Sequence, residues 1–108
     1  MDNIDFKIQK EKLLDLANEI MSKKQPEYTN QNEDVFYNFK NTAKSLGLEP
    51  MEVWAVFFHK HIQAILTHAH NPNMDEAEPI ESRYADALNY LFLGYGMIIE
   101  NKKNAKVF

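Results

Sequence analysis

The chain has 108 residues, a formal net charge of −4 and no cysteine. This length fits one hydrophobic core and leaves no room for a second domain, and three glycines with four prolines are few for a loop-rich fold. The negative charge argues against nucleic-acid binding, which needs a basic face. The lack of cysteine excludes disulfides, thiolate nucleophiles and cysteine-ligated metal sites.

The sequence contains no targeting or membrane-spanning segment. Residues 1–12 are charged throughout and include no apolar run, so they predict no signal peptide. His59, Lys60, Asp86 and Asn89 interrupt the longest apolar stretches, which fall well short of the roughly 20 residues that span a bilayer. We therefore expect a cytoplasmic protein without membrane contact.

The first predicted helix covers residues 5–23. Apolar residues recur there at three- and four-residue spacing, from Phe6 to Met21, which is typical of an amphipathic helix. The polar segment 24–31 follows and contains Pro26, so it is predicted to be a loop.

The second and third predicted helices have clear start and stop signals. Asn32 as N-cap and Gly47 just after the last turn bound a helix over residues 32–46. Pro50 then favours the first turn of a helix over residues 50–68, with Glu52 placed where the helix dipole favours a carboxylate. The run VWAVFF inside it is apolar on every side, which predicts a central helix packed on more than one face.

The fourth predicted helix covers residues 79–101 and begins at Pro79. Gly94 and Gly96 lie inside it, where each costs about 1 kcal/mol relative to alanine, so they predict close approach of a partner helix or a ligand. Four helices with short loops indicate an all-α antiparallel bundle. Because the third helix has no clearly polar side, we also expect a homo-oligomer.

A polar stripe runs along the fourth helix in otherwise apolar surroundings. At about 100° per residue, it gathers Ser82, Arg83, Asp86, Asn89 and Tyr90. Unpaired burial of such groups would be costly. The stripe is therefore either the solvent face of the helix or a site, and the sequence leaves both open.

Histidines of the third helix fall on two faces. His59 shares one side with Glu52, whereas His61 and His68 share the side of Trp54. None of the histidine pairs on one face has the i, i+3 or i, i+4 spacing of a helical metal pair, so no metal site is predicted. Lys60 between two histidines either extends to solvent or binds an anion.

Two stretches of the sequence resemble known proteins. EVWAVFFHKHIQAI (residues 52–65) and EPIESRYADALNYLFL (residues 78–93) look like a group of small phage-encoded helical proteins, and the resemblance covers residues 27–100. More distantly, they are similar to nucleotide-modification-associated and MazG-like all-α nucleotide pyrophosphatase domains. The resemblance to phage proteins implies a host-cytoplasmic protein acting on nucleotides.

In the pyrophosphatase family, clustered carboxylates on neighbouring helices bind Mg²⁺. The resemblance implies Glu52, Glu81 and Asp86 as the catalytic acids here, although Arg83 stands where the family pattern has an acid three residues before Asp86. The clustered acids of that family are thus incomplete in this chain, which favours nucleotide binding over hydrolysis.

The leading hypothesis is binding, and sequestration, of a nucleotide or nucleotide-derived signal without a cofactor. His59, Lys60 and Arg83 are expected to contact phosphate, Tyr90 or Tyr28 to stack on a base, and Asp86 and Asn89 to orient ribose or base edges. The alternatives are a Mg²⁺-dependent nucleotide pyrophosphatase and a protein-interaction module.

Overall fold

The computed structural model has four helices and no strand in residues 1–29, 33–75 and 77–106, which are the residues it describes; for residues 25–29 and Lys106 it describes the backbone alone. The helices are α1 (Asn3–Thr29), α2 (Tyr37–Leu46), α3 (Pro50–His70) and α4 (Ile80–Lys106). The predicted all-α class with four helices is confirmed.

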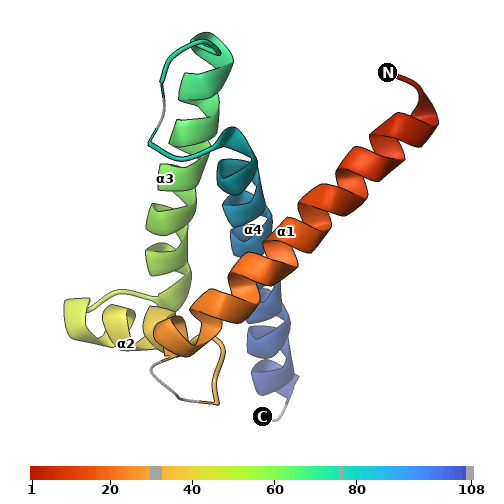
Figure 1. The fold of residues 1–108 in the computed structure, drawn as a ribbon. Coiled ribbons are helices and arrows are strands. Elements are labelled where there is room, and N and C mark those ends of the chain that lie inside the picture. The colour runs from red at the N-terminus through yellow and green to blue at the C-terminus, as the bar shows by residue number, and fades with distance from the viewer. Residues whose placement is uncertain (30–32, 76, 107–108) are drawn as a thin grey trace.

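The helix α4 occupies the centre of the fold. It runs antiparallel beside α3, and α1 crosses it obliquely on another side (Figure 1). The short helix α2 packs at one end, against α3 and α1. The N-terminal half of α1 projects away from the other helices (Figure 1), and residues 1–12 are all exposed.

The start of α3 and the end of α2 follow the sequence signals. Gly47 has a φ of 70°, the left-handed conformation that closes a helix at low cost in glycine. Pro50 lies in the first turn of α3, and the Glu52 carboxylate accepts the backbone N–H of Glu49 at 2.9 Å. This capping box satisfies a backbone donor that the helix itself leaves unpaired.

Three predicted boundaries are wrong, and one of them is the end of the fourth helix, which lies at Lys106 and not at residue 101. The helix α1 continues through Pro26 to Thr29, although a proline past the first turn removes a backbone hydrogen bond and crowds the carbonyl four residues before it. The second helix begins at Tyr37, after a turn in which the Asp34 carboxylate accepts the N–H of Phe36 at 2.9 Å. Asn32, the predicted N-cap, lies outside the described residues.

The expectation that the third helix is the central one is also wrong. Only Val53 of α3 is buried, and Val56, Phe57 and Leu66 are exposed. The helix α3 does pack against two neighbours, α2 and α4, but it lies at one side of the fold, whereas α4 lies between α3 and α1 (Figure 1). Over the described residues, no helix combines the length and apolarity needed to cross a membrane.

The core lies where α2, α3 and α4 meet. Its buried members are Phe36, Phe39, Ala43, Val53, Tyr90 and Met97. At the edge of this core, the Lys40 ammonium on α2 forms an ion pair with the Asp34 carboxylate at 2.6 Å. It also pairs with the carboxylate of Glu100, near the end of α4, and so connects α2 to α4.

Both glycines of α4 sit under aromatic rings. A Cβ on Gly94 would lie 2.5 Å from the indole of Trp54, and one on Gly96 would lie 2.9 Å from the ring of Phe36. Real Cβ atoms do not approach so closely. Of the two predicted reasons for these glycines, close helix packing is the one that applies.

Candidate functional site

The polar residues in the middle of α4 face the interior. Asp86, Asn89 and Tyr90 are 8%, 6% and 8% exposed. The stripe predicted on this helix is therefore no solvent face at these positions. A buried carboxylate and a buried carboxamide are costly without partners, so their partners define the candidate site.

Asp86 lies between basic side chains from two other helices. Its Oδ1 is 3.8 Å from the Lys24 ammonium of α1, and its Oδ2 is 4.0 Å from Nδ1 of His61 on α3. The His61 ring also packs on Tyr90, with centroids 4.7 Å apart. The Asp86 carboxylate on α4 thus lies close to basic side chains of both α1 and α3.

Burial governs the ionisation of His61. Desolvation lowers the pKa of its imidazole below the ordinary value of 6.5, and the Asp86 carboxylate opposes that shift while Lys24 reinforces it. The imidazole is therefore neutral at pH 7. Its Nδ1 is buried and makes no hydrogen bond within the described residues, so it offers one unsatisfied polar atom beside Asp86.

Two hydrogen bonds fix α4 to its neighbours at adjacent residues. The Asn89 carboxamide donates to the carbonyl of Ala17 on α1 at 2.9 Å. The Trp54 indole N–H donates to the carbonyl of Tyr90 at 2.6 Å. Both bonds come from partly or fully buried donors, whose loss would leave unpaired groups inside the fold.

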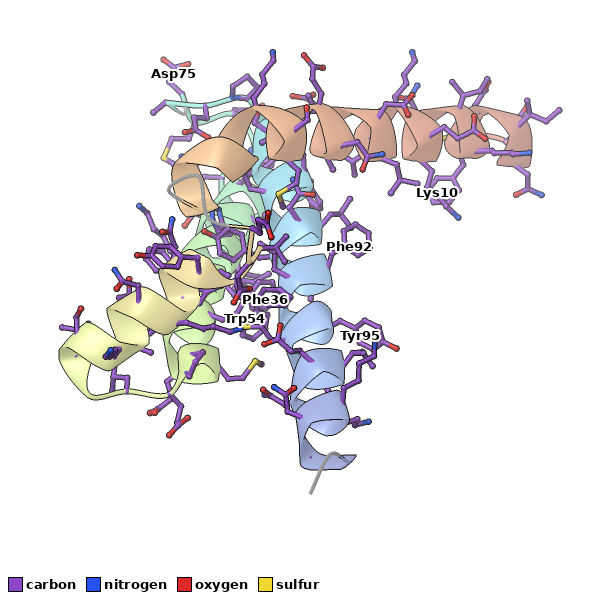
Figure 2. The ribbon with its side chains drawn as sticks, turned by 90° about the horizontal axis from the view of Figure 1, so that it is seen from below. Lys10, Phe36, Trp54, Asp75, Phe92 and Tyr95 are labelled. Atoms are coloured by element: carbon purple, nitrogen blue, oxygen red, sulfur yellow. The ribbon has the colours of Figure 1, made fainter. Side chains whose placement is uncertain are left out.

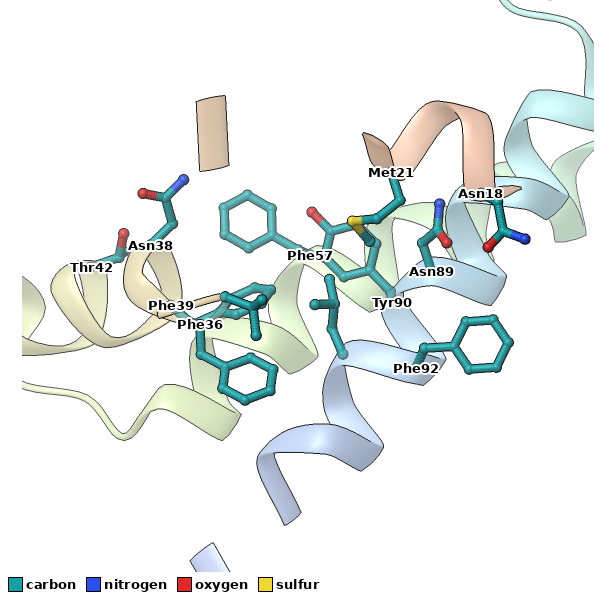
Figure 3. A pocket seen from close by; sticks show the side chains of 12 residues that line it. Asn18, Met21, Phe36, Asn38, Phe39, Thr42, Phe57, Asn89, Tyr90 and Phe92 are labelled. Carbon is teal, nitrogen blue, oxygen red and sulfur yellow. The ribbon is translucent and has the colours of Figure 1, made fainter. Parts of the chain in front are cut away.

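A pocket of about 470 Å³ opens beside these residues, and all four helices contribute to its wall or rim. Figure 3 shows aromatic rings at its centre and carboxamides around them. Its lining residues within the described part of the chain are all uncharged: Asn18, Met21, Val35, Phe36, Asn38, Phe39, Thr42, Phe57, Asn89, Tyr90, Phe92 and Leu93. Its volume lies in the range of small-molecule sites.

A much smaller cavity adjoins the pocket behind Asn89 and Tyr90. Met21, Asn89, Tyr90 and Leu93 line both spaces, and the smaller one is also lined by Ile20, Lys24 and Asp86. Its volume of about 10 Å³ is close to the space that one water needs. The ion pair thus lies directly behind the polar wall of the pocket.

The predicted phosphate ligands do not border this pocket. His59 and Lys60 are exposed on α3, and the His59 ring interacts with Gln63 of the same helix at 3.4 Å. Arg83 lies 3.8 Å from the Glu78 carboxylate and lines a separate hollow of about 240 Å³ near the turn between α3 and α4. Only Asp86, Asn89 and Tyr90 of the predicted ligand-binding residues are brought together.

The three predicted catalytic acids do not converge. Glu52 caps the start of α3, about 13 Å along that helix from His61, which faces Asp86. Glu81 is exposed at the start of α4. Within the described residues, no group of three His, Asp or Glu side chains could hold a metal ion. The side chain of Tyr28 lies outside the described residues.

Sequence reasoning missed Lys24, His61 and the contribution of α2. Lys24 was assigned to a loop, although the helix α1 extends past it and points it at Asp86. His61 lies on the same face of the helical wheel as Trp54, which contacts α4. This shared face was a sequence signal that His61 also points toward α4. The pocket residues on α2, Asn38 and Thr42, showed no signal, because a polar residue at a helix edge looks the same whether it borders water or a pocket.

Comparison with protein-family models, curated proteins and solved structures found no match for this chain.

Proposed function

We propose that this chain binds a nucleotide-derived small molecule by holding its base in the pocket between the four helices. The observation that carries the proposal is the composition of the pocket wall. Aromatic rings lie at its centre, three carboxamides stand around them, and none of its described lining residues is charged (Figure 3). A nucleobase is planar and uncharged, and its edge carries donors and acceptors.

The rings match the faces of a base. Phe57 and Tyr90 lie with centroids 6.4 Å apart, and Phe57 is 43% exposed although it lines the pocket. An exposed aromatic ring beside a cavity gains contact area when a flat ligand covers it. Stacking of a base on an aromatic side chain contributes about 1–3 kcal/mol.

The carboxamides match the edge of a base. Each carries two donors and one acceptor oxygen, so a carboxamide can pair with the adjacent donor and acceptor that bases present. Asn38 stands at the rim of the pocket on α2, and Asn18 and Asn89 stand on the side of α1 and α4 (Figure 3). We assign Lys24, which lines the adjoining cavity, as the cation nearest to the phosphate of the ligand.

The resemblance to small phage proteins supports a binding role and extends the proposal to sequestration of a nucleotide signal of the host. In this role the ligand is held intact. Asp86, paired with Lys24 and close to His61 behind the pocket wall, then holds that wall in place and does not contact the sugar, which is the role that the sequence predicted for it.

The test is retention of intact nucleotide. Purified protein is mixed with linear and cyclic nucleotides plus Mg²⁺, and the filtrate is chromatographed before and after heat denaturation. The proposal expects one nucleotide to disappear from the filtrate and to return unchanged on denaturation. New products would instead show an enzyme, and an unchanged panel would contradict the proposed function.

Two variant pairs locate the binding in this pocket. Phe57→Ala removes a stacking ring and should weaken binding about 5- to 150-fold, whereas Val56→Ala alters an exposed neighbour outside the pocket lining and should not. Asn38→Leu removes a rim carboxamide, with exposed Asn41→Leu on the same helix as its control. Equal effects within each pair, in protein that is folded by circular dichroism, would place the binding elsewhere.

A further inference from the structure

The outer face of α4 carries an apolar seam that none of the described residues of the chain covers. Its members are Tyr84, Leu88, Leu91, Tyr95 and Ile98, and all but half-buried Leu88 are exposed. They follow one another at alternating spacings of four and three residues, which is the repeat of a coiled-coil seam. The opposite side of the same helix forms the core, so α4 is apolar on both sides, as buried helices are.

The accessible surface area and the radius of gyration of the chain are both larger than those of a compact monomer of this size. Its surface is 8175 Å², whereas a compact monomer of 12.7 kDa exposes about 6,200 Å². Its radius of gyration is 16.2 Å, against about 13 Å for a compact domain of this length. Both differences indicate surface that belongs in an interface.

The projecting half of α1 borders the same open side. In Figure 2 it extends over the face from which Phe92 and Tyr95 point, and Lys10 points from it toward that side. Phe6, one turn before Lys10, is 60% exposed, and by its position on the helix it faces within about 40° of Lys10. The arm and α4 therefore form two walls of one apolar corner.

We propose that two copies of this chain pair through the seam of α4, with the two α4 helices antiparallel and Leu91 at the two-fold axis. The interface does not depend on the proposed ligand. A two-fold interface brings the same patch of both subunits together. The seam suits this because Tyr84 and Ile98 lie at equal spacing from Leu91, and Leu88 and Tyr95 differ in spacing by one residue. Tyr84 then faces Ile98 of the second copy, and Leu88 faces Tyr95.

Charge at the two ends of the seam fixes the antiparallel direction. Glu81 lies three residues before Tyr84 and Lys102 lies four after Ile98, so both continue the repeat, and both are exposed. The antiparallel pairing sets Glu81 of each copy opposite Lys102 of the other. A parallel pairing would set like charges together, which is unfavourable.

The exposed area is sufficient for a stable pair. With about 200 Å² for each large side chain, the exposed fractions of Tyr84, Leu91, Phe92, Tyr95 and Ile98 give roughly 500 Å² for each copy. Phe6 of the arm raises this to roughly 630 Å². Specific interfaces bury about 600–1,000 Å² of each partner.

The first test is sedimentation equilibrium across a concentration series up to about 100 µM, on the full chain. The wild type should be a dimer. Leu91→Glu sets two carboxylates against each other at the axis and should raise the dimer dissociation constant at least 100-fold. Val56→Glu, an equally polar change at an exposed apolar residue of α3, should leave it unchanged.

Charge reversal tests the direction of the helices. Glu81→Lys and Lys102→Glu should each weaken the dimer several-fold, and the double variant should restore it. A monomeric wild type at the highest concentration, a Leu91→Glu variant that still dimerises, or a double variant weaker than either single one would each overturn the proposal. Circular dichroism of each variant shows that it is folded, so loss of the dimer is not loss of the fold.

Discussion

Gly94→Ala should destabilise the protein even though alanine favours a helix. The new Cβ would lie 2.5 Å from Cε2 and 2.6 Å from Cζ2 of Trp54, and the indole is held by its hydrogen bond to the Tyr90 carbonyl. Overpacking costs about 1–3 kcal/mol, loss of the indole bond costs about 1 kcal/mol, and the helix gains about 1 kcal/mol. The net loss in free energy of unfolding is thus about 1–3 kcal/mol.

Urea denaturation at one fixed protein concentration measures this loss, and the melting temperature should fall by at least about 5 °C. A double-mutant cycle with Trp54→Leu isolates the cause. In that background the indole is absent, so Gly94→Ala should be neutral or should stabilise by up to about 1 kcal/mol. A destabilisation of equal size in both backgrounds would refute the assigned contact.

Three further changes follow from the same packing and charges. Gly96→Ala should destabilise less than Gly94→Ala, because its Cβ meets a single ring atom of Phe36 within 3 Å; equal losses in urea titrations would contradict this. Because the folded-state pKa of His61 lies below 6.5, the unfolded chain takes up a proton first, so stability should fall as pH drops below about 6.5, and melting curves should show less of this fall in His61→Gln. Lys40→Met removes a half-exposed cation that serves two carboxylates and should cost up to about 1 kcal/mol at low salt and less at high salt, as thermal melts at both ionic strengths would show.

Local signals in the sequence determined the helices better than their arrangement. Gly47 and Pro50 act on their own backbone, so the end of α2 and the start of α3 were predictable from chemistry within a few residues. The central position of α4 was not, because apolar runs such as VWAVFF show that a helix is hydrophobic but not which neighbours cover it. The hydrophobic surface of α3 is in fact partly exposed, at Val56 and Phe57.

The candidate site, like the fold, was predictable from the sequence only in part. Asp86, Asn89 and Tyr90 were identifiable because polar groups in an apolar helix need partners. Lys24, more than sixty positions away in the chain, becomes a partner of Asp86 only through the crossing of α1 and α4. His59 and Lys60 illustrate the converse, since neighbours of His61 in sequence lie on other faces of the helix and point outward.

The central helix of the fold follows the other three along the sequence. The bond between Asn89 and Ala17 joins residues 72 positions apart, so α1 finds its main neighbour only after α2 and α3 have been made. Contacts between residues so far apart in sequence slow folding. The chain loses the entropy of closing a long loop before the new contacts stabilise it. In a chain truncated before α4, α1 and α3 would lack the helix on which both of them pack. Their apolar surfaces would be exposed, and cellular proteases and chaperones would recognise the truncated chain as unfolded.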